Sequence, residues 1–301
     1  MNALPPIHGY HKQAITWLDQ MSLDSAEVPP RQSPVLSEDS FDEGPEELVG
    51  LWESGAQISW LGGPAAVDGA WPQNVDGDPC WHVATFHLGD AHAALGDPRE
   101  RGWPSDVADL LPDHGYMQIF HDLTTYGMDA VDGERGGWLV SWSADDDPAS
   151  RPALVAAPES SSAPDEAFQM GVFLPGWSIP CPLDLYGGED ARFERAEAAV
   201  SALDLAWLNQ RMPGEKHRYP TPSTRLMGYS STGEEAAVTE YLPNVLPLDQ
   251  AGDEYVLLAE IESWTTLNGW FGDASSLEVW MRKSDLAARR FNCCWCIIRT
   301  D

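Results

Sequence analysis

Chain breakers are spread along the whole sequence and limit what this chain can fold into. The 301 residues include 26 glycines and 24 prolines, which long helices do not tolerate in their interiors. The sequence therefore predicts many short elements joined by turns rather than a helical bundle. Residues 190–211 are the exception, because Phe193, Val200 and Trp207 recur at helical spacing before a Pro-Gly pair. They predict one long helix.

Short apolar segments typical of β-strands occur in two parts of the chain, in the same order. The predicted equivalents are the turns at 62–64 and 226–229, the strands at 81–88 and 255–261, and the strands at 116–120 and 277–281. This order predicts an internal duplication of approximately residues 56–143 and 225–298.

The fold class that follows is α+β, with antiparallel β-sheets built from two similar β-rich halves. A helical lead-in is expected over residues 1–55 and a single domain over 56–301. The chain has 43% hydrophobic residues and 14 tryptophans, enough apolar surface for a sizeable core. Apolar strand pairs of the two halves should meet in that core, while acidic groups face water.

Acidic residues dominate the charge, and the formal net charge is −31. A field of this sign repels phosphates, so neither nucleic acid nor a membrane surface is an expected partner. A basic protein would be attracted instead. The alternative is that the charge serves solubility or salt adaptation, because only three of the 17 basic residues are lysines, which suggests a general bias toward arginine.

The lack of a targeting signal and the pattern of the cysteines both favour a cytoplasmic protein. The N-terminus lacks a basic segment followed by an apolar run, and no stretch is long enough to span a membrane. The five cysteines, three of them at 293, 294 and 296, do not form a disulfide framework. In a strand, Cys294 and Cys296 would share one face and Cys293 the other, so core packing is expected. No metal and no cofactor are predicted.

Catalytic signatures are missing from the sequence: it contains no P-loop, Rossmann fingerprint, Gly-x-Ser-x-Gly or HExxH. The sequence therefore favours a non-enzymatic role and leaves catalysis open. The residues with suitable chemistry are His87, His114, His121, Asp273 and Arg289. His121 and Asp122 would point to opposite faces of a strand and would not touch.

Trp264 and Trp270 flank a polar loop. Tryptophans in loops anchor interfaces. These two residues, with the neighbouring Asp273, are the predicted binding surface. Asp273 follows a glycine, so a turn role for its carboxylate is the alternative.

Four segments, in this order, resemble a known bacterial family. They are Trp-Leu-Gly-Gly-Pro at 60–64, Leu-Pro-Asp-His-Gly-Tyr-Met-Gln-Ile-Phe at 111–120, Arg-Leu-Met-Gly-Tyr at 225–229, and Trp-Phe-Gly-Asp-Ala at 270–274 with Asp-Leu-Ala-Ala-Arg-Arg-Phe at 285–291. On these residues the chain resembles the YwqG-like family. The resemblance implies an α+β fold with antiparallel sheets and a cytoplasmic bacterial protein, and it brings no established activity. The double glycine that the family often carries is absent at 227–228, which argues against a ligand role for that loop.

Three hypotheses for function follow. The leading one is a non-enzymatic acidic binding protein that engages a basic protein partner, in an immunity-like, antitoxin-like or regulatory role. The alternative is a hydrolase or small-molecule binder with its site at the junction of the two halves. The third is a metal-dependent protein that uses the histidines. The oligomeric state is not predicted.

Overall fold

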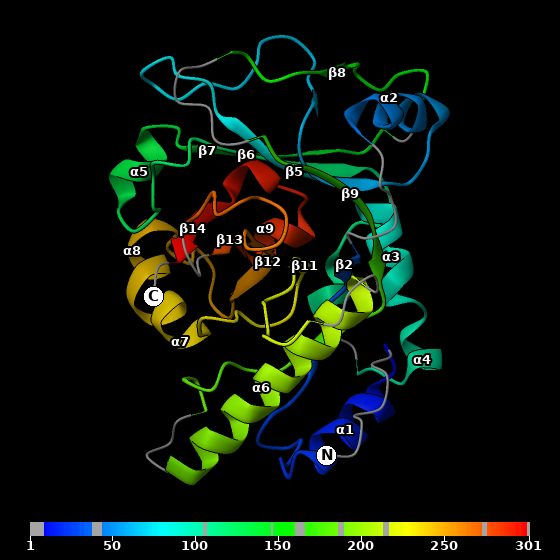
Figure 1. The fold of residues 1–301 in the computed structure, drawn as a ribbon. Coiled ribbons are helices and arrows are strands. Elements are labelled where there is room, and N and C mark those ends of the chain that lie inside the picture. Colours follow the sequence, from blue (N-terminus) through cyan, green and yellow to red (C-terminus); the bar gives the residue numbers. More distant parts are fainter. Residues whose placement is uncertain are drawn as a thin grey trace.

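A ten-stranded antiparallel sheet runs through the computed structural model, which describes residues 9–37, 44–104, 107–145, 147–159, 166–185, 190–212, 217–272 and 276–299 (Figure 1). In sheet order its strands are β14 (Trp295–Arg299), β13 (Ser276–Arg282), β12 (Tyr255–Glu262), β11 (Arg225–Leu226), β2 (Val35–Ser37), β9 (Phe168–Leu174), β3 (Ser59–Gly62), β5 (Trp81–His87), β6 (Tyr116–His121) and β7 (Trp138–Ser143). Two small sheets pair β1 (Arg31–Gln32) with β10 (Trp177–Ser178), and β4 (Ala65–Ala66) with β8 (Leu154–Val155).

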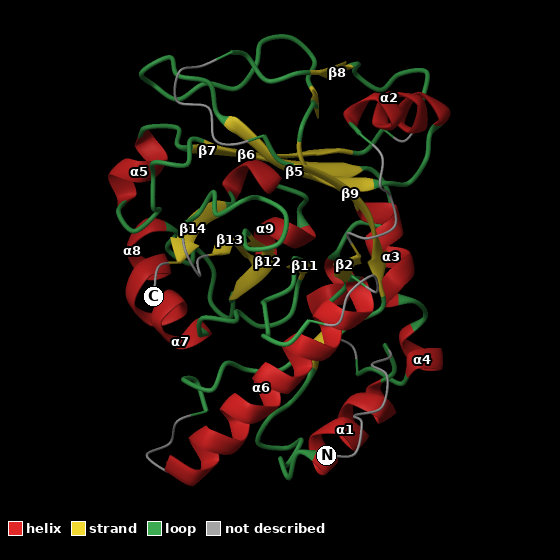
Figure 2. Ribbon diagram, viewed as in Figure 1, coloured by secondary structure: helices red, strands yellow, loops and turns green. Residues whose placement is uncertain are grey.

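Short helices surround the sheet, and one long helix lies against one side of it (Figure 2). The α-helices are α1 (His11–Gln20), α2 (Pro45–Ser54), α3 (Leu88–Leu95), α4 (Pro98–Arg101), α5 (Ala130–Glu134), α6 (Asp190–Arg211), α7 (Glu234–Ala236), α8 (Leu242–Val245) and α9 (Lys283–Ala287). The remaining turns are η1 (Val107–Leu110), the π-helical η2 (Ala237–Tyr241) and η3 (Phe291–Cys293). None of the described helices has the length and apolar character needed to cross a membrane.

The two halves of the main sheet have the same strand order. Strands β3, β5, β6 and β7 form one four-stranded unit, β11 to β14 form the other, and β2 and β9 lie between them. The pairing registers match position by position: Leu61 faces Ala84 as Leu226 faces Ala259. Both units also carry a β-bulge at the equivalent place, just before Ala84 and just before Ala259. The antiparallel α+β fold with two similar halves is confirmed.

Both halves contribute to one hydrophobic core. Val83 and Phe86 of β5 belong to the same buried cluster as Leu258 and Ile261 of β12, and all four are fully buried. The sheet curls strongly enough to bring its two ends together. There, Trp138 Nε1 of β7 donates to the carbonyl of Cys294 at 3.2 Å. The expectation that the strand pairs share one interior is therefore confirmed.

Helix α6 has the bounds that the sequence predicts. It buries Ala196, Leu203 and Trp207 in a second apolar cluster, together with Trp17 of α1 and Trp177 of β10. Figure 1 shows α6 and α1 side by side below the sheet. The helix thereby joins the N-terminal segment to the rest of the fold.

Three local features differ from the sequence-based expectation. The lead-in contains helices α1 and α2 as expected, but also strands β1 and β2, which are too short to show periodicity. Strand β5 ends at His87, because its imidazole accepts a hydrogen bond from the Asp90 N–H (3.2 Å) and caps α3. Cys293 lies in η3 and not in a strand. The division of the chain at residue 55 stays a prediction.

Candidate functional site

The three candidate histidines do not converge on one site. His87 and His121 lie at opposite ends of the β5–β6 pair, since His87 faces Tyr116 and His121 faces Trp81. Five residues of strand separate those ends, about 16 Å. His114 is half exposed, in the loop before β6, and its Nδ1 lies 2.7 Å from the carboxylate of Asp113.

His121 is a neutral core histidine. Burial lowers its pKa to about 4, and the nearby Asp122 opposes that shift only in part. Its Nδ1 accepts from the Leu123 N–H at 3.0 Å. The expectation that His121 and Asp122 point apart is wrong: Nδ1 and the Asp122 carboxylate are 3.9 Å apart, because β6 ends at His121 and the chain turns there.

The remaining predicted site residues that the structure describes differ in their surroundings. Asp273 lies outside the described residues. Arg289 is exposed, has a left-handed φ of 60° and donates to the carbonyls of Leu110 and Leu286. Trp264 is 57% exposed, as a contact residue would be. Trp270, in contrast, packs against the main core.

The cysteines pack as expected for a core. Cys294 and Cys296 are buried members of the main cluster, and burial raises the pKa of both thiols. Across the described parts of the chain, no three His, Cys, Asp or Glu side chains are grouped so that they could hold a metal ion.

The most unusual chemistry lies on the second half of the sheet, where three glutamates are buried. Glu260, Glu262 and Glu278 are at most 1% exposed, so the expectation that acidic groups face water is wrong here. Each is paired with an arginine, since isolated buried charges are too costly. The N···O distances are 2.6 Å for Arg225–Glu260, 3.4 Å for Arg211–Glu262 and 3.6 Å for Arg299–Glu278.

Two of these glutamates fix the loop that follows β11. The hydroxyl of Ser231 donates to Glu260, and the hydroxyl of Ser230 donates to Glu278. Thr232 Oγ1 donates to Glu278 at 2.8 Å. Burial raises the pKa of Glu278, and Arg299 counteracts this shift. The loop is therefore held by buried charge on its inner side.

Asp204 of α6 completes the charged layer. It is half-buried, and desolvation raises its pKa to about 7, with Arg225 lowering it and Glu260 raising it further. Three arginines and three glutamates are already paired in this layer. A fourth carboxyl group therefore holds its proton near neutral pH.

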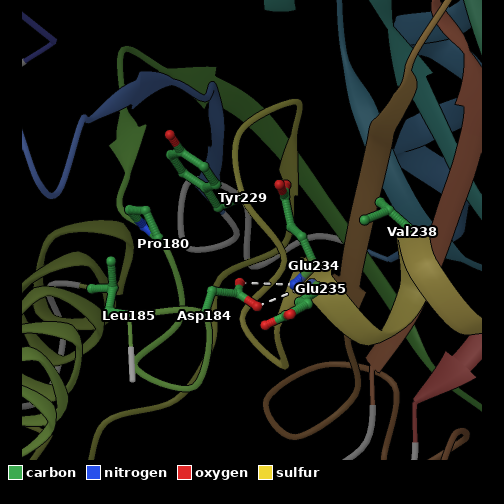
Figure 3. Close-up of a pocket in the computed structure, with 7 residues that line it drawn as sticks. All are labelled: Pro180, Asp184, Leu185, Tyr229, Glu234, Glu235 and Val238. Atoms are coloured by element: carbon green, nitrogen blue, oxygen red, sulfur yellow. Dashed lines mark hydrogen bonds between the residues drawn. The ribbon is translucent and has the colours of Figure 1, made fainter. Parts of the chain in front are cut away.

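A pocket opens on the outer side of the loop that follows β11 (Figure 3). Its volume is about 390 Å³, and its lining residues are Pro180, Asp184, Leu185, Tyr229, Glu234, Glu235 and Val238. Figure 3 shows that the three carboxylates come from two segments, the turn after β10 and the start of α7. Leu185, Pro180 and Val238 supply apolar walls. The pocket is thus suited to a cation on an apolar stem.

Hydrogen bonds hold the two acidic segments of the pocket together. The Asp184 carboxylate accepts from the N–H groups of Glu234 at 2.9 Å and Glu235 at 3.0 Å. Burial raises the pKa of Glu234, and the Arg31 cation counteracts this. The Glu235 side chain is exposed. Negative charge is therefore concentrated at the pocket although each carboxylate has a different environment.

Arg31 of β1 lies beside the pocket and contacts two of its lining residues. Its Nη1 is 3.2 Å from Glu234 Oε1 and 3.3 Å from Oε2. Its guanidinium carbon lies 3.9 Å from the centre of the Tyr229 ring. A cation thus already lies against this aromatic and acidic surface.

Sequence reasoning missed this pocket. The missing double glycine argues against a ligand role for the loop that carries Tyr229. In the structure, however, Met227 and Gly228 have φ angles of 59° and 89° and make the same turn as Gly62 and Gly63, at 63° and 62°. The available signal was Ser-Ser-Thr-Gly-Glu-Glu at 230–235, in which hydroxyls precede adjacent carboxylates. The partners in segments β1 and 180–185 could be found only from the fold.

The fold and the pocket define an α+β protein with a two-part antiparallel sheet and a carboxylate-lined surface pocket. The chain belongs to the family described as domain of unknown function (DUF1963), which matches residues 59–299. No match is found among curated proteins.

Proposed function

We propose that this protein is a non-enzymatic binding protein that engages a basic protein partner through the pocket of Figure 3. The observation that supports this proposal is the joint presence of Asp184, Glu234 and Glu235 beside Tyr229 and apolar walls. Carboxylates next to an aromatic face attract cations. The net charge of −31 adds long-range attraction, which raises the association rate for a basic partner.

The resemblance to the YwqG-like family agrees with this proposal, since that family brings no established activity. A cytoplasmic location and a regulatory, immunity-like or antitoxin-like role belong to the same proposal. The negative field that attracts a basic protein disfavours nucleic acid and membrane surfaces. The alternative of a hydrolase at the junction of the halves has less support, because His87 and His121 lie at opposite ends of a strand pair.

A pair of charge reversals tests the proposal. Glu235→Lys places a cation in the pocket, whereas Glu240→Lys makes the same change in net charge on an exposed residue of η2 that does not line the pocket. Tagged wild-type protein and both variants are used to retain partners from the native host at low salt, and retained proteins are identified and then purified for direct binding. We expect Glu235→Lys to weaken binding about tenfold or more, and Glu240→Lys to change it little.

Two results would contradict the proposal. One is that no basic protein is retained at low salt. The other is that the purified partner binds the two variants equally, which would mean that the overall charge, and not the pocket, determines binding.

A further inference from the structure

Arg31 shows which kind of cation the pocket surface accepts. Its guanidinium lies over the flat face of Tyr229 and pairs with both carboxylate oxygens of Glu234. Both contacts to Glu234 come from Nη1 alone, so the feature specific to guanidinium is the stacking of a planar, weakly hydrated cation on the aromatic ring. A lysine ammonium can pair with Glu234, but it is a compact, strongly hydrated charge and does not stack on the ring as guanidinium does.

The geometry points to an arginine side chain of the partner as the group that the pocket binds, with Arg31 as the internal residue that it displaces. This inference rests on the proposed function and adds the chemical class of the ligand and a built-in competitor. The incoming guanidinium takes the place over Tyr229 and against Glu234, and its methylene stem lies on the apolar wall of Pro180 and Leu185.

Displacement is feasible because the internal pair is open to water. The Arg31 side chain is 38% exposed and that of Glu234 is 20% exposed, so the pair is only partly desolvated and contributes little net stability. Exchange replaces one guanidinium–carboxylate contact with another of the same kind. Two guanidinium groups on one carboxylate would repel each other, so binding of the second favours release of the first.

The backbone around Arg31 does not depend on its side-chain contacts. Arg31 pairs with Ser178 in the β1–β10 ladder, and the adjacent Gln32 donates to the carbonyl of Leu95 at 3.1 Å. The Arg31 side chain can therefore leave the Tyr229 ring while its strand stays in place. This separates the competitor role from a role in holding the fold.

The test uses the full chain and three small probes, N-acetylargininamide, its lysine counterpart and its citrulline counterpart, in calorimetric titrations at low salt. Citrulline keeps the shape of arginine and lacks the charge. We expect the arginine probe to bind about fivefold more tightly than the lysine probe, and the citrulline probe not to saturate. Arg31→Ala should tighten binding of the arginine probe about tenfold, because an occupied site reduces apparent affinity by the fraction that is free.

Arg135→Ala is the matched control. It removes an exposed arginine that pairs with an exposed carboxylate, that of Asp76 at 3.5 Å, and changes the net charge equally. Because loss of Arg31 could disturb folding, melting temperatures are compared and Arg31→Gln serves as a second variant. Equal affinities of Arg31→Ala and Arg135→Ala for the probe, or weaker binding by Arg31→Ala, would overturn the competitor role. A lysine probe that binds as tightly as the arginine probe would overturn the guanidinium preference.

Failure of this inference can be distinguished from failure of the proposed function. If the arginine probe binds as expected but no basic protein is retained, the inference holds for a guanidinium site and the protein-partner proposal fails. If a basic partner binds through Glu235 but the arginine probe neither binds nor competes with it, the proposed function holds and this inference fails.

Discussion

The turn after β3 and the turn after β11 have the same backbone path but different side-chain chemistry. In the first half, Trp60 Nε1 donates to the carbonyl of Pro64 at 2.8 Å. In the second half, Arg225 at the equivalent position donates to the carbonyl of Tyr229 at 2.6 Å. Each donor reaches the residue four positions further on, so the fold requires a long donor here and does not require a charge.

The neighbouring strands show the same contrast. Thr85 and Gln118 face each other in β5 and β6, where Glu260 and Glu278 face each other in β12 and β13. The amide of Gln118, in the orientation that satisfies both of its groups, bonds the backbone of Ala66 at 2.7 and 3.0 Å. Neutral groups thus hold one turn and charged groups hold the other. Of these two turns, the one held by charged groups is also the one whose outer side lines the pocket.

The largest expected effect tests whether the charged layer is essential to the stability of the second half of the sheet. Glu260→Ala leaves Arg225 buried without its carboxylate and should cost about 4 kcal/mol of unfolding free energy. Thr85→Ala, at the equivalent position, removes only a neutral hydroxyl and should cost about 1 kcal/mol. Urea unfolding of both variants measures the difference. Costs within about 1 kcal/mol of each other would mean that the two halves differ in composition but not in energetics.

Turn geometry gives the next effect. Gly62 has a φ of +63°, and an added Cβ would lie 2.0 Å from the carbonyl oxygen of Ala167. We expect Gly62→Ala to cost about 3 kcal/mol, although Met227 occupies the equivalent position with φ of 59°. Gly69→Ala is the control, because Gly69 has φ of +103° and open space around its Cβ position. A cost no larger than that of Gly69→Ala would show that the neighbouring chain moves aside.

The sequence predicted the elements that carry a strong period and missed those that depend on distant contacts. Helix α6 and strands β5, β6, β12 and β13 were found from apolar periodicity, which reports a local pattern. Strand β2 was missed because three residues show no period and it pairs with β9 and β11, far away in the chain. In the sequence, the buried glutamates alternate with apolar residues as the solvent side of a half-buried strand would. In the fold, α6 and the loop at 227–233 cover them.

The pocket was less predictable than the fold for the same reason. Its walls come from segments 180–185 and 229–238, and Arg31 comes from a third segment. A run of hydroxyl and carboxylate residues at 230–235 has many uses in proteins. Its role depends on which segment lies opposite, and no local pattern encodes that.

A smaller effect concerns pH and the titration of Asp204 in the charged layer. The pKa of Asp204 is about 7 in the folded protein, above its ordinary value of 3.8, so the folded state holds this proton between those values. Its stabilising contribution is present at acidic pH and is lost as the pH rises through about 7. Stability should fall by about 1.3 kcal/mol between pH 5 and pH 8, roughly half of what the shift implies over that range, because the carboxyl group keeps some contact with water.

Asp204→Asn removes this titration and is the test. Urea unfolding at several pH values should give a flatter profile for the variant than for the wild type. Parallel profiles would mean that Asp204 is solvated in the folded protein and takes no part in the charged layer.

The smallest effect comes from replacing a serine of the charged half by alanine, the residue found in the neutral half. Ser231 lies six residues after Arg225, as Ala66 lies six residues after the equivalent Trp60, and its hydroxyl donates to the buried carboxylate of Glu260. Ser231→Ala should cost about 1 kcal/mol, the value of a hydrogen bond to a charged group that keeps other donors, since Arg225 and the Ser231 N–H still contact Glu260. Binding of the arginine probe should weaken in parallel if this hydroxyl helps to hold Tyr229 and Glu234 in place. A loss of stability with unchanged probe affinity would separate the two sides of the loop: the inner side would hold the fold, and the outer side would bind independently of the charge behind it.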